Sequence, residues 1–205
     1  MTPISASANP YPAEPTLDQR LAQLPSPEAW PLEQSRPGPD LFIFKARIDD
    51  RRHPRSGQVL PRVALEAPDW VNVIAVTIEG LVILVRQFRF GSGAVSTEIP
   101  AGMVDPGEQP LAAARRELLE ETGFAAERWT GLGSVDPNPA FLGNRCHLWL
   151  ADGCRKVAEP QMDGGEDIAL AFWPLDAVRQ AIRSGDIDHS LVVCAFSRIL
   201  DLSRD

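Results

Sequence analysis

Charged side chains gather in one short stretch of the chain. The segment GMVDPGEQPLAAARRELLEETGF, residues 102–124, holds four glutamates, two adjacent arginines and three glycines. Pro110 suits the first turn of a helix and Gly123 suits the position just after its last turn, so a helix of about thirteen residues is predicted between them. Glu117, Glu120 and Glu121 then share one face, because residues three and four apart are neighbours on a helix.

Three carboxylates on one helix face are unfavourable unless something compensates their charge. Neighbouring like charges destabilise a helix by roughly 0.2–0.5 kcal/mol per pair. Glu120 and Glu121 also lie near the C-terminal end, where the helix dipole disfavours anions. A divalent cation would remove both penalties, and oxygen ligands without a nearby His or Cys favour Mg²⁺ or Mn²⁺. Taken alone, however, the three carboxylates favour the simpler interpretation of a solvated acidic face.

The spacing of the whole stretch distinguishes between these interpretations. The stretch resembles the signature of the Nudix hydrolases at every defined position, and the elements around it follow the Nudix order. A chance match in a chain of this length is on the order of one in ten million at average residue frequencies. The matching residues are Gly102, Glu108, the run Arg116-Glu117-Leu118, the pair Glu120-Glu121 and the pair Gly123-Phe124.

The Nudix resemblance implies a metal site that bridges a diphosphate. The implied cofactor is Mg²⁺, with Mn²⁺ as an alternative, at two or more ions per site. The ions would neutralise the phosphoryl oxygens and activate a water in line with the scissile P–O bond. The implied roles are Glu117 and Glu121 as the main metal ligands, Glu120 as a ligand or water-positioning residue, the carbonyl of Ala101 as a backbone ligand, and Arg116 as the residue that orients the cluster through Glu108.

Flanking segments narrow the substrate. VRQFRFG at 85–91 and STEIPAG at 96–102, together with the signature, resemble the ADP-ribose and nucleotide-sugar pyrophosphatases. That subfamily carries a proline about fifteen residues past the signature, where this chain has Pro139, although proline is common here at 19 of 205 residues. The diadenosine polyphosphate class would require a tyrosine further on. The one tyrosine of this chain is Tyr11, so that class is disfavoured.

Glu166 is the candidate general base. It lies in the segment GGEDIALAFWPL, which is similar to the loop where ADP-ribose hydrolases place a glutamate near the attacking water. Asp167 is the fallback, and Glu120 or another helix glutamate is the alternative base. Because Gly- and Asp-rich loops are often only turns, the segment is equally consistent with a surface turn.

Three more residues are candidate substrate contacts. Arg89 is predicted to pair with a phosphate and Glu98 to contact substrate or an ordered water, with a surface ion pair as the alternative. Trp70, at a strand entrance, is a candidate for stacking on the base. Aromatic residues at strand ends more often belong to a core or an interface.

Three functions are compatible with these residues. The first is Mg²⁺-dependent hydrolysis of the pyrophosphate bond of ADP-ribose or a related nucleoside diphosphate sugar, giving a nucleoside monophosphate and a sugar phosphate. The second is a Nudix enzyme for nucleoside triphosphates or dinucleotides. The third is a Nudix-fold module that binds a nucleotide sugar without turnover, and the complete set of helix glutamates argues against it.

Composition restricts the class of protein. The net charge of −8 argues against a nucleic-acid partner, because phosphate contacts need basic patches. Apolar runs such as LVILV at 81–85 are far shorter than the ~20 residues of a membrane span. The N-terminus lacks the features of a signal peptide, and the odd, irregularly spaced cysteines are typical of reduced thiols. A cytoplasmic location is therefore expected.

The predicted fold is α+β, and the resemblance implies a Nudix-type α/β/α sandwich with a mixed sheet and an N-terminal antiparallel strand region. Residues 1–39 are predicted to form a Pro- and Ser-rich arm that is mobile or loosely docked, with one helical stretch at 17–24. Residues 40–205 are predicted to form a single Nudix domain. Strands are expected at 40–48, 58–66, 71–78, 81–90, 94–102, 130–136 and 145–151 and in IALAFWPL at 168–175, and helices at 110–122, 175–184 and 188–202. The resemblance also implies a swapped homodimer, in which Arg47 and Arg51 would reach the partner's site.

Overall fold

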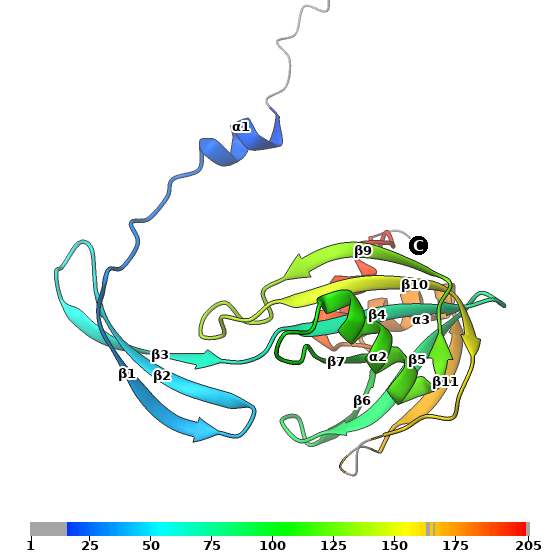
Figure 1. The fold of residues 1–205 in the computed structure, drawn as a ribbon. Helices are drawn as coiled ribbons and strands as arrows, with labels where there is room; N and C mark the ends of the chain where they lie inside the picture. The colour runs from blue at the N-terminus through cyan, green and yellow to red at the C-terminus, as the bar shows by residue number, and fades with distance from the viewer. Residues whose placement is uncertain (1–15, 163–164, 166, 204–205) are drawn as a thin grey trace, which may run out of the picture.

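The computed structural model describes residues 16–162, 165 and 167–203 of the chain. Within these residues the strands form two separate sheets that share no ladder. A three-stranded antiparallel sheet of β1 (Leu32–Leu41), β2 (Phe44–Arg52) and β3 (Val59–Glu66) projects away from the main body (Figure 1). Helix α1 (Leu17–Ala22) precedes it and confirms the predicted helical stretch.

The first strand differs from the prediction. A strand over 40–48 is wrong, because β1 ends at Leu41, the chain turns at Phe42, and β2 begins at Phe44. Residues 32–39, assigned above to the arm, already belong to β1, so a boundary at residue 39 falls inside a strand. The segment was hidden by its two prolines, which break the strand pattern. They are tolerated because β1 is an edge strand, where a missing N–H costs no ladder bond, and because its register shifts between Pro37 and Asp40.

The main sheet is mixed and confirms the predicted α+β class. Its central order is β11-β5-β4-β10-β8, with β6 on β5, β7 on β4 and β9 on β10. Strands β4 and β10 run parallel, and the other pairs are antiparallel. The strands are β4 (Trp70–Thr77), β5 (Leu81–Arg89), β6 (Ala94–Glu98), β7 (Ala101–Met103), β8 (Phe124–Ala125), β9 (Arg128–Val135), β10 (Cys146–Lys156) and β11 (Ala169–Pro174).

Helices cover both faces of this sheet. Helix α2 (Pro110–Thr122) packs on one face, and α3 (Leu175–Ser184) and α4 (Ser190–Phe196) pack on the other (Figure 1). Strand β4 supplies both cores, because successive side chains alternate between faces: Val73 faces α2, whereas Ile74 faces α3 and α4. None of the described helices is long and apolar enough to cross a membrane.

Two elements are shorter than predicted. The strand expected over 94–102 is interrupted at Ile99 and Pro100, because the carbonyl of Pro100 accepts a hydrogen bond from the N–H of Val73 in β4 (2.8 Å) and turns the chain onto that strand. The last helix ends at Phe196, after which the N–H groups of Ile199 and Leu200 close tight turns onto the Phe196 carbonyl.

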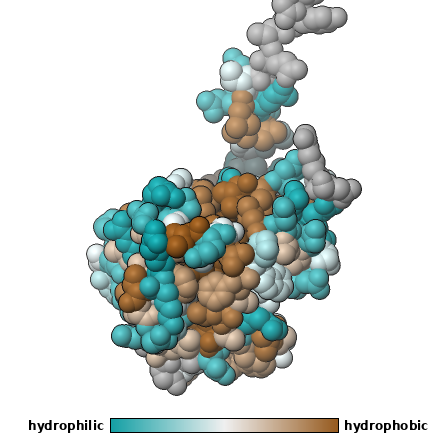
Figure 2. Space-filling model, turned by 90° about the vertical axis from the view of Figure 1, so that its right-hand side faces the viewer, coloured by the Kyte–Doolittle hydropathy of each residue, from teal (hydrophilic) through white to brown (hydrophobic). Residues whose placement is uncertain are grey.

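The face that lies on the right of Figure 1 is partly apolar. Figure 2 shows apolar side chains over the middle of this face, with hydrophilic ones around them. Strand β11 is an edge of the main sheet and exposes Phe172 and Trp173, and the ring of Phe172 contacts that of Phe124 at a centroid distance of 5.7 Å.

Candidate metal and active site

Helix α2 begins and ends where its local sequence predicts. Pro110 lies in the first turn, and Gly123 adopts the left-handed conformation (φ 74°) and donates its N–H to the carbonyl of Leu119. The side chains of Ala113, Ala114 and Leu118 are buried against the sheet. This packing determines which way the acidic residues of the helix face.

The three glutamates of the helix differ in exposure. The side chain of Glu120 is 44% exposed, that of Glu117 is 13% exposed, and Glu121 is only 3% exposed. A buried carboxylate needs a strong partner, because burial without one costs several kcal/mol. The lower exposure of Glu117 and Glu121 therefore favours these two residues over Glu120 as groups that hold a cation.

Strand β7 brings the backbone against these carboxylates. The N–H of Ala101 donates to Oε2 of Glu121 at 3.0 Å. Gly102 lies directly under the carboxylate of Glu117, so closely that a Cβ at this position would overlap its oxygens. The glycine is therefore required to let the helix carboxylate meet the strand.

Arg116 organises the acidic groups. Its Nε and Nη2 donate to the two oxygens of Glu108 at 3.1 and 2.9 Å, in a bidentate pair. Its Nη1 donates to Glu117 (2.8 Å) and to Glu120 (3.2 Å), and its Nη2 also donates to the carbonyl of Met103 (2.9 Å). The hydrogen bond to Glu108 is the main reason that the pKa of Arg116 is raised, and the same bond lowers the pKa of Glu108. Arg116 thus bonds three glutamates and a β7 carbonyl at once, as the predicted orienting role would require.

The donor set fits a hard divalent cation. Within the described residues no three His, Cys, Asp or Glu side chains are already arranged around one point as a metal site, and the guanidinium of Arg116 lies between Glu117 and Glu120. The groups on offer are carboxylate oxygens and the β7 backbone, which are the ligands that Mg²⁺ and Mn²⁺ prefer. Because Gly102 has no side chain, the Glu117 carboxylate can approach the backbone.

Comparison with known proteins agrees with this arrangement. The model of the family described as "NUDIX domain" matches residues 68–194. The chain belongs to the Nudix family. It is 35% identical to the methanol dehydrogenase activator of Bacillus methanolicus over 154 residues, which is 75% of this chain and 83% of that protein. It is 32% identical to the ADP-ribose pyrophosphatase of Mycobacterium tuberculosis over 153 residues, 74% of this chain and 73% of that protein.

A solved structure shares the fold. The crystal structure of an ADP compounds hydrolase superimposes with a TM-score of 0.75 at 21% identity, covering 86% of this chain and 95% of that chain. The match to the family model and the similarity to the Mycobacterium tuberculosis relative make the chain a Nudix hydrolase. Nudix hydrolases generally use divalent metal ions. In this family context, α2 with the loop before it is the Nudix helix and loop.

Arg89 and Glu98 pair with each other beside the Nudix loop. Nε and Nη2 of Arg89 donate to the two oxygens of Glu98, both at 2.7 Å. Glu98 is 1% exposed, whereas the Arg89 side chain is 41% exposed. The ion pair of the alternative interpretation is present, but it does not lie wholly at the surface, because the Glu98 carboxylate is buried. His189, at the start of α4, places Nε2 3.8 Å from Glu98. Nothing in its sequence context indicated this contact.

Glu98→Gln is expected to lower the free energy of unfolding at pH 7 by about 2 kcal/mol, because the Arg89 guanidinium loses its charged partner. Burial raises the pKa of Glu98, but the Arg89 hydrogen bond and the charges of His189 and Arg89 outweigh it, so the pKa lies below 4.5. The carboxylate's contribution is therefore complete above pH 4.5 and is lost as the pH falls through the lower folded value.

Urea unfolding from pH 7 into the acid range checks this expectation. The difference between wild type and variant should shrink as the pH falls below 4.5. Glu79→Gln, on an exposed turn, is the control and should leave the unfolding curve unchanged. A difference that stays constant with pH would show that Glu98 acts through packing and not through its charge.

The remaining predicted residues lie in different surroundings. Trp70 is half-buried and packs against the core below α3 and α4, in line with the alternative of a core residue. Glu166 lies outside the described residues, and Asp167 is exposed just before β11. Pro139 opens a turn in the loop between β9 and β10, where the carbonyl of Asn138 accepts the N–H of Leu142 (2.8 Å).

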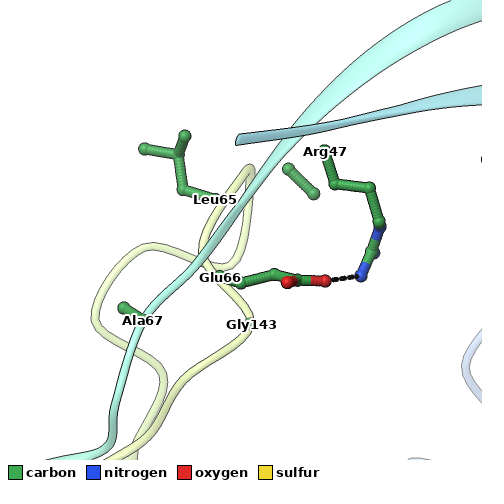
Figure 3. A pocket seen from close by; sticks show the side chains of 6 residues that line it. Arg47, Leu65, Glu66, Ala67 and Gly143 are labelled. Atoms are coloured by element: carbon green, nitrogen blue, oxygen red, sulfur yellow. Dashed lines mark hydrogen bonds and ion pairs between the residues drawn. The ribbon is translucent and has the colours of Figure 1, made fainter. Parts of the chain in front are cut away.

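Arg47 and Arg51 lie on β2 of the N-terminal sheet, away from the Nudix helix (Figure 1). Both donate to the Asp49 carboxylate, Arg47 at 2.9 Å and Arg51 at 3.0 Å. Arg47 makes a second hydrogen bond to Asp49, and the Ser35 hydroxyl donates to it as well. These hydrogen bonds, those from Arg47 first, lower the pKa of Asp49 to about 2. Arg47 also donates to Glu66 at 2.6 Å (Figure 3). This pair borders a cavity of about 260 Å³ between β2, β3 and the loop at Gly143.

Proposed function

We propose that this Nudix hydrolase is a Mg²⁺-dependent pyrophosphatase for ADP-ribose or a related nucleoside diphosphate sugar. One observation carries the proposal: the carboxylates of Glu117 and Glu121 both lie against the backbone of residues 101–102. Arg116 donates a hydrogen bond to Glu117 in this arrangement. The name of the Mycobacterium tuberculosis relative supports the choice of substrate. Two or more Mg²⁺ ions, with Mn²⁺ as an alternative, are the proposed cofactor, and the cytoplasm is the proposed location.

The protein residues have separate tasks in this reaction. Glu117 and Glu121, with the carbonyl of Ala101, would hold the cations, and Glu120 would bind a cation or position water. The bound cations would neutralise the diphosphate oxygens and lower the pKa of a bound water. Arg116 keeps the carboxylates in place before substrate arrives, which removes the cost of ordering them during the reaction. The water oxygen forms a new bond to phosphorus as the bridging P–O bond breaks.

Arg89 is the proposed phosphate contact. Its exposed guanidinium is held in place by the buried Glu98, so Glu98 would support Arg89 and not bind substrate as its own anchor. Such a pair presents a rigid cation at low entropic cost. Stacking of the base on Trp70 remains a proposal whose test is the affinity of Trp70→Leu for nucleotides.

A substrate panel tests the proposed function. Purified protein with Mg²⁺ is given ADP-ribose, GDP-mannose, UDP-sugars, NADH and nucleoside triphosphates, and the products are identified. The proposal predicts the highest kcat/KM for an ADP- or other nucleoside diphosphate sugar, with a nucleoside monophosphate and a sugar phosphate as products. Faster turnover of triphosphates would favour the second function, and tight binding without turnover of any compound would favour a binding module.

Glu166→Gln is expected to lower kcat by about a hundredfold or more, because general-base catalysis typically contributes two to four orders of magnitude. The Mg²⁺ concentration for half-maximal activity should stay close to that of wild type, since the cations are held by α2. Asp167→Asn tests the fallback base: it should keep kcat if Glu166 is the base, and a loss of kcat in Asp167→Asn alone would assign the base to Asp167. If both variants turn over at the wild-type rate, the base is one of the helix glutamates.

The N-terminal sheet supports a homodimer as the proposed assembly. The three-stranded sheet projects from the main body, and most residues of its outer strands β1 and β3 are exposed. Clustered exposed apolar side chains often mark an interface. The exposed apolar side chains of this sheet are Leu32, Leu41, Phe42, Ile43, Val59 and Val63. We propose that a second copy of the chain covers them. Sedimentation should show a dimer for wild type and a monomer for Val63→Glu, and a wild-type monomer would contradict the proposal.

A further inference from the structure

The connection between the N-terminal sheet and the Nudix domain is short, and a neighbouring loop forms hydrogen bonds with it. Three residues, 67–69, join β3 to β4. The loop at 136–145, between β9 and β10, runs beside them (Figure 3). Its Phe141 carbonyl accepts the N–H of Leu65 at the end of β3 (2.7 Å), and Leu142 forms a bridge with Leu65. We call residues 136–145 the clamp loop.

The clamp loop holds the connection at two further points. Asn144, which is 4% exposed, donates its side-chain amide to the carbonyl of Pro68 at 2.8 Å. The N–H of Arg145 donates to Oδ1 of Asp69 at 2.8 Å, and the other oxygen of Asp69 lies 2.9 Å from Nε2 of His147 in β10. Together with the Leu65 bond, these contacts span the whole connection from β3 to β4.

Asp69 also faces the Nudix loop. Its backbone carbonyl accepts the N–H of Val104 at 2.8 Å, directly after β7. The carbonyl of the preceding residue, Met103, accepts a hydrogen bond from Arg116 at 2.9 Å. Asp69 therefore contacts two segments. Its side chain bonds the clamp loop, and its backbone carbonyl bonds Val104, next to the Met103 carbonyl that accepts from Arg116.

We propose that Asp69 is a positioning residue that couples the placement of the N-terminal sheet to the Nudix loop. It would act by holding the 67–69 connection, Val104 and the clamp loop in one arrangement, and not by binding substrate or cation itself. The effect on catalysis rests on the proposed function, whereas the mechanical coupling does not. Pro139 contributes to the same arrangement. It begins the turn of the clamp loop that brings the Phe141 carbonyl to the N–H of Leu65.

Hydrogen exchange on the full-length protein without substrate tests the coupling. In Asp69→Ala the amide of Arg145 loses its acceptor and must exchange faster in any case. The proposal predicts that the amides of Val104 and Leu65, whose backbone acceptors remain, also exchange about tenfold faster. The amide of Val73, in the core of β4, should be unchanged. Asp69→Asn keeps an oxygen acceptor for Arg145 and should restore most of the protection.

Activity gives a second readout. If the Nudix loop loosens, the Mg²⁺ concentration for half-maximal turnover should rise several-fold in Asp69→Ala, by more than kcat falls, and Asp69→Asn should recover it. Asp136→Ala is the matched control, because it removes a different carboxylate from Arg145, at 2.9 Å, and leaves Asp69 in place. Faster exchange confined to the Arg145 amide would overturn the proposal. If Asp69→Ala does not fold, the same comparison is made with Asp69→Ser, where faster exchange at Arg145, Leu65 and Val104 together supports the proposal and faster exchange at Arg145 alone overturns it.

Discussion

Glu121→Gln is expected to lower the turnover rate by two to four orders of magnitude, equivalent to roughly 3–5 kcal/mol of transition-state stabilisation. The substitution removes a negative charge from a group that is 3% exposed and proposed to hold the cation. It keeps an oxygen that can accept the Ala101 N–H. The stability of the metal-free protein should therefore be unchanged or slightly higher, because a buried charge is replaced by a neutral amide.

Steady-state kinetics and thermal unfolding, each with and without Mg²⁺, check this prediction. Mg²⁺ should raise the melting temperature of wild type, since a ligand that binds only the native state stabilises it, and should have little effect on the variant. Glu127→Gln, an exposed glutamate that pairs with Arg155, is the matched control and should behave as wild type. Near-normal turnover of Glu121→Gln would show that the metal assignment is wrong.

Gly102→Ala is expected to reduce activity by about a hundredfold, the typical cost of displacing a catalytic group by about 1 Å. Its methyl group would occupy the space of the Glu117 carboxylate. The backbone at Gly102 does not have a positive φ, so alanine causes no backbone strain there, and the obstructing atoms are the end of a flexible side chain. The carboxylate should swing aside while the fold remains stable, which unfolding curves and kinetics together can show.

Gly123→Ala provides the opposite case. Gly123 has a φ of 74°, a conformation that costs a residue with a Cβ about 1–2 kcal/mol, and its Cβ would meet the backbone carbonyl of Ala158. This variant should lose stability but keep most of its activity per folded molecule. Loss of stability without loss of turnover in Gly102→Ala would mean that Gly102 serves the fold and not the position of Glu117.

Local signals in the sequence were sufficient for the Nudix helix. Its start at Pro110 and its end at Gly123 depend on the conformations that these two residues themselves prefer, and the side-chain spacing between them depends only on helix geometry. The strands predicted over 71–78 and 81–90 pair as a hairpin, and Gly80 adopts the positive φ that its turn requires. The signature spacing then led to the family, which the comparisons show.

Non-local pairing was not visible in the sequence. Strand β1 contains Pro37 and exposes most of its side chains, so it has neither the composition nor the alternation of a typical strand, and it forms only because β2 pairs with it. The bonds from Arg145 and His147 to Asp69 join residues 76 and 78 positions apart. No periodicity of one segment reports such a contact.

The sequence by itself determined the chemistry of this protein, because the types and spacing of the helix glutamates, Arg116 and Gly102 are properties of one continuous segment. Only the tertiary structure decided how these groups are used. Packing of α2 on the sheet buries Glu121 and leaves Glu120 exposed. Strand pairing turns Glu98 toward Arg89, and the clamp loop connects Asp69 to the Nudix loop. Burial and long-range pairing arise when distant segments meet, so they are decided by the fold as a whole.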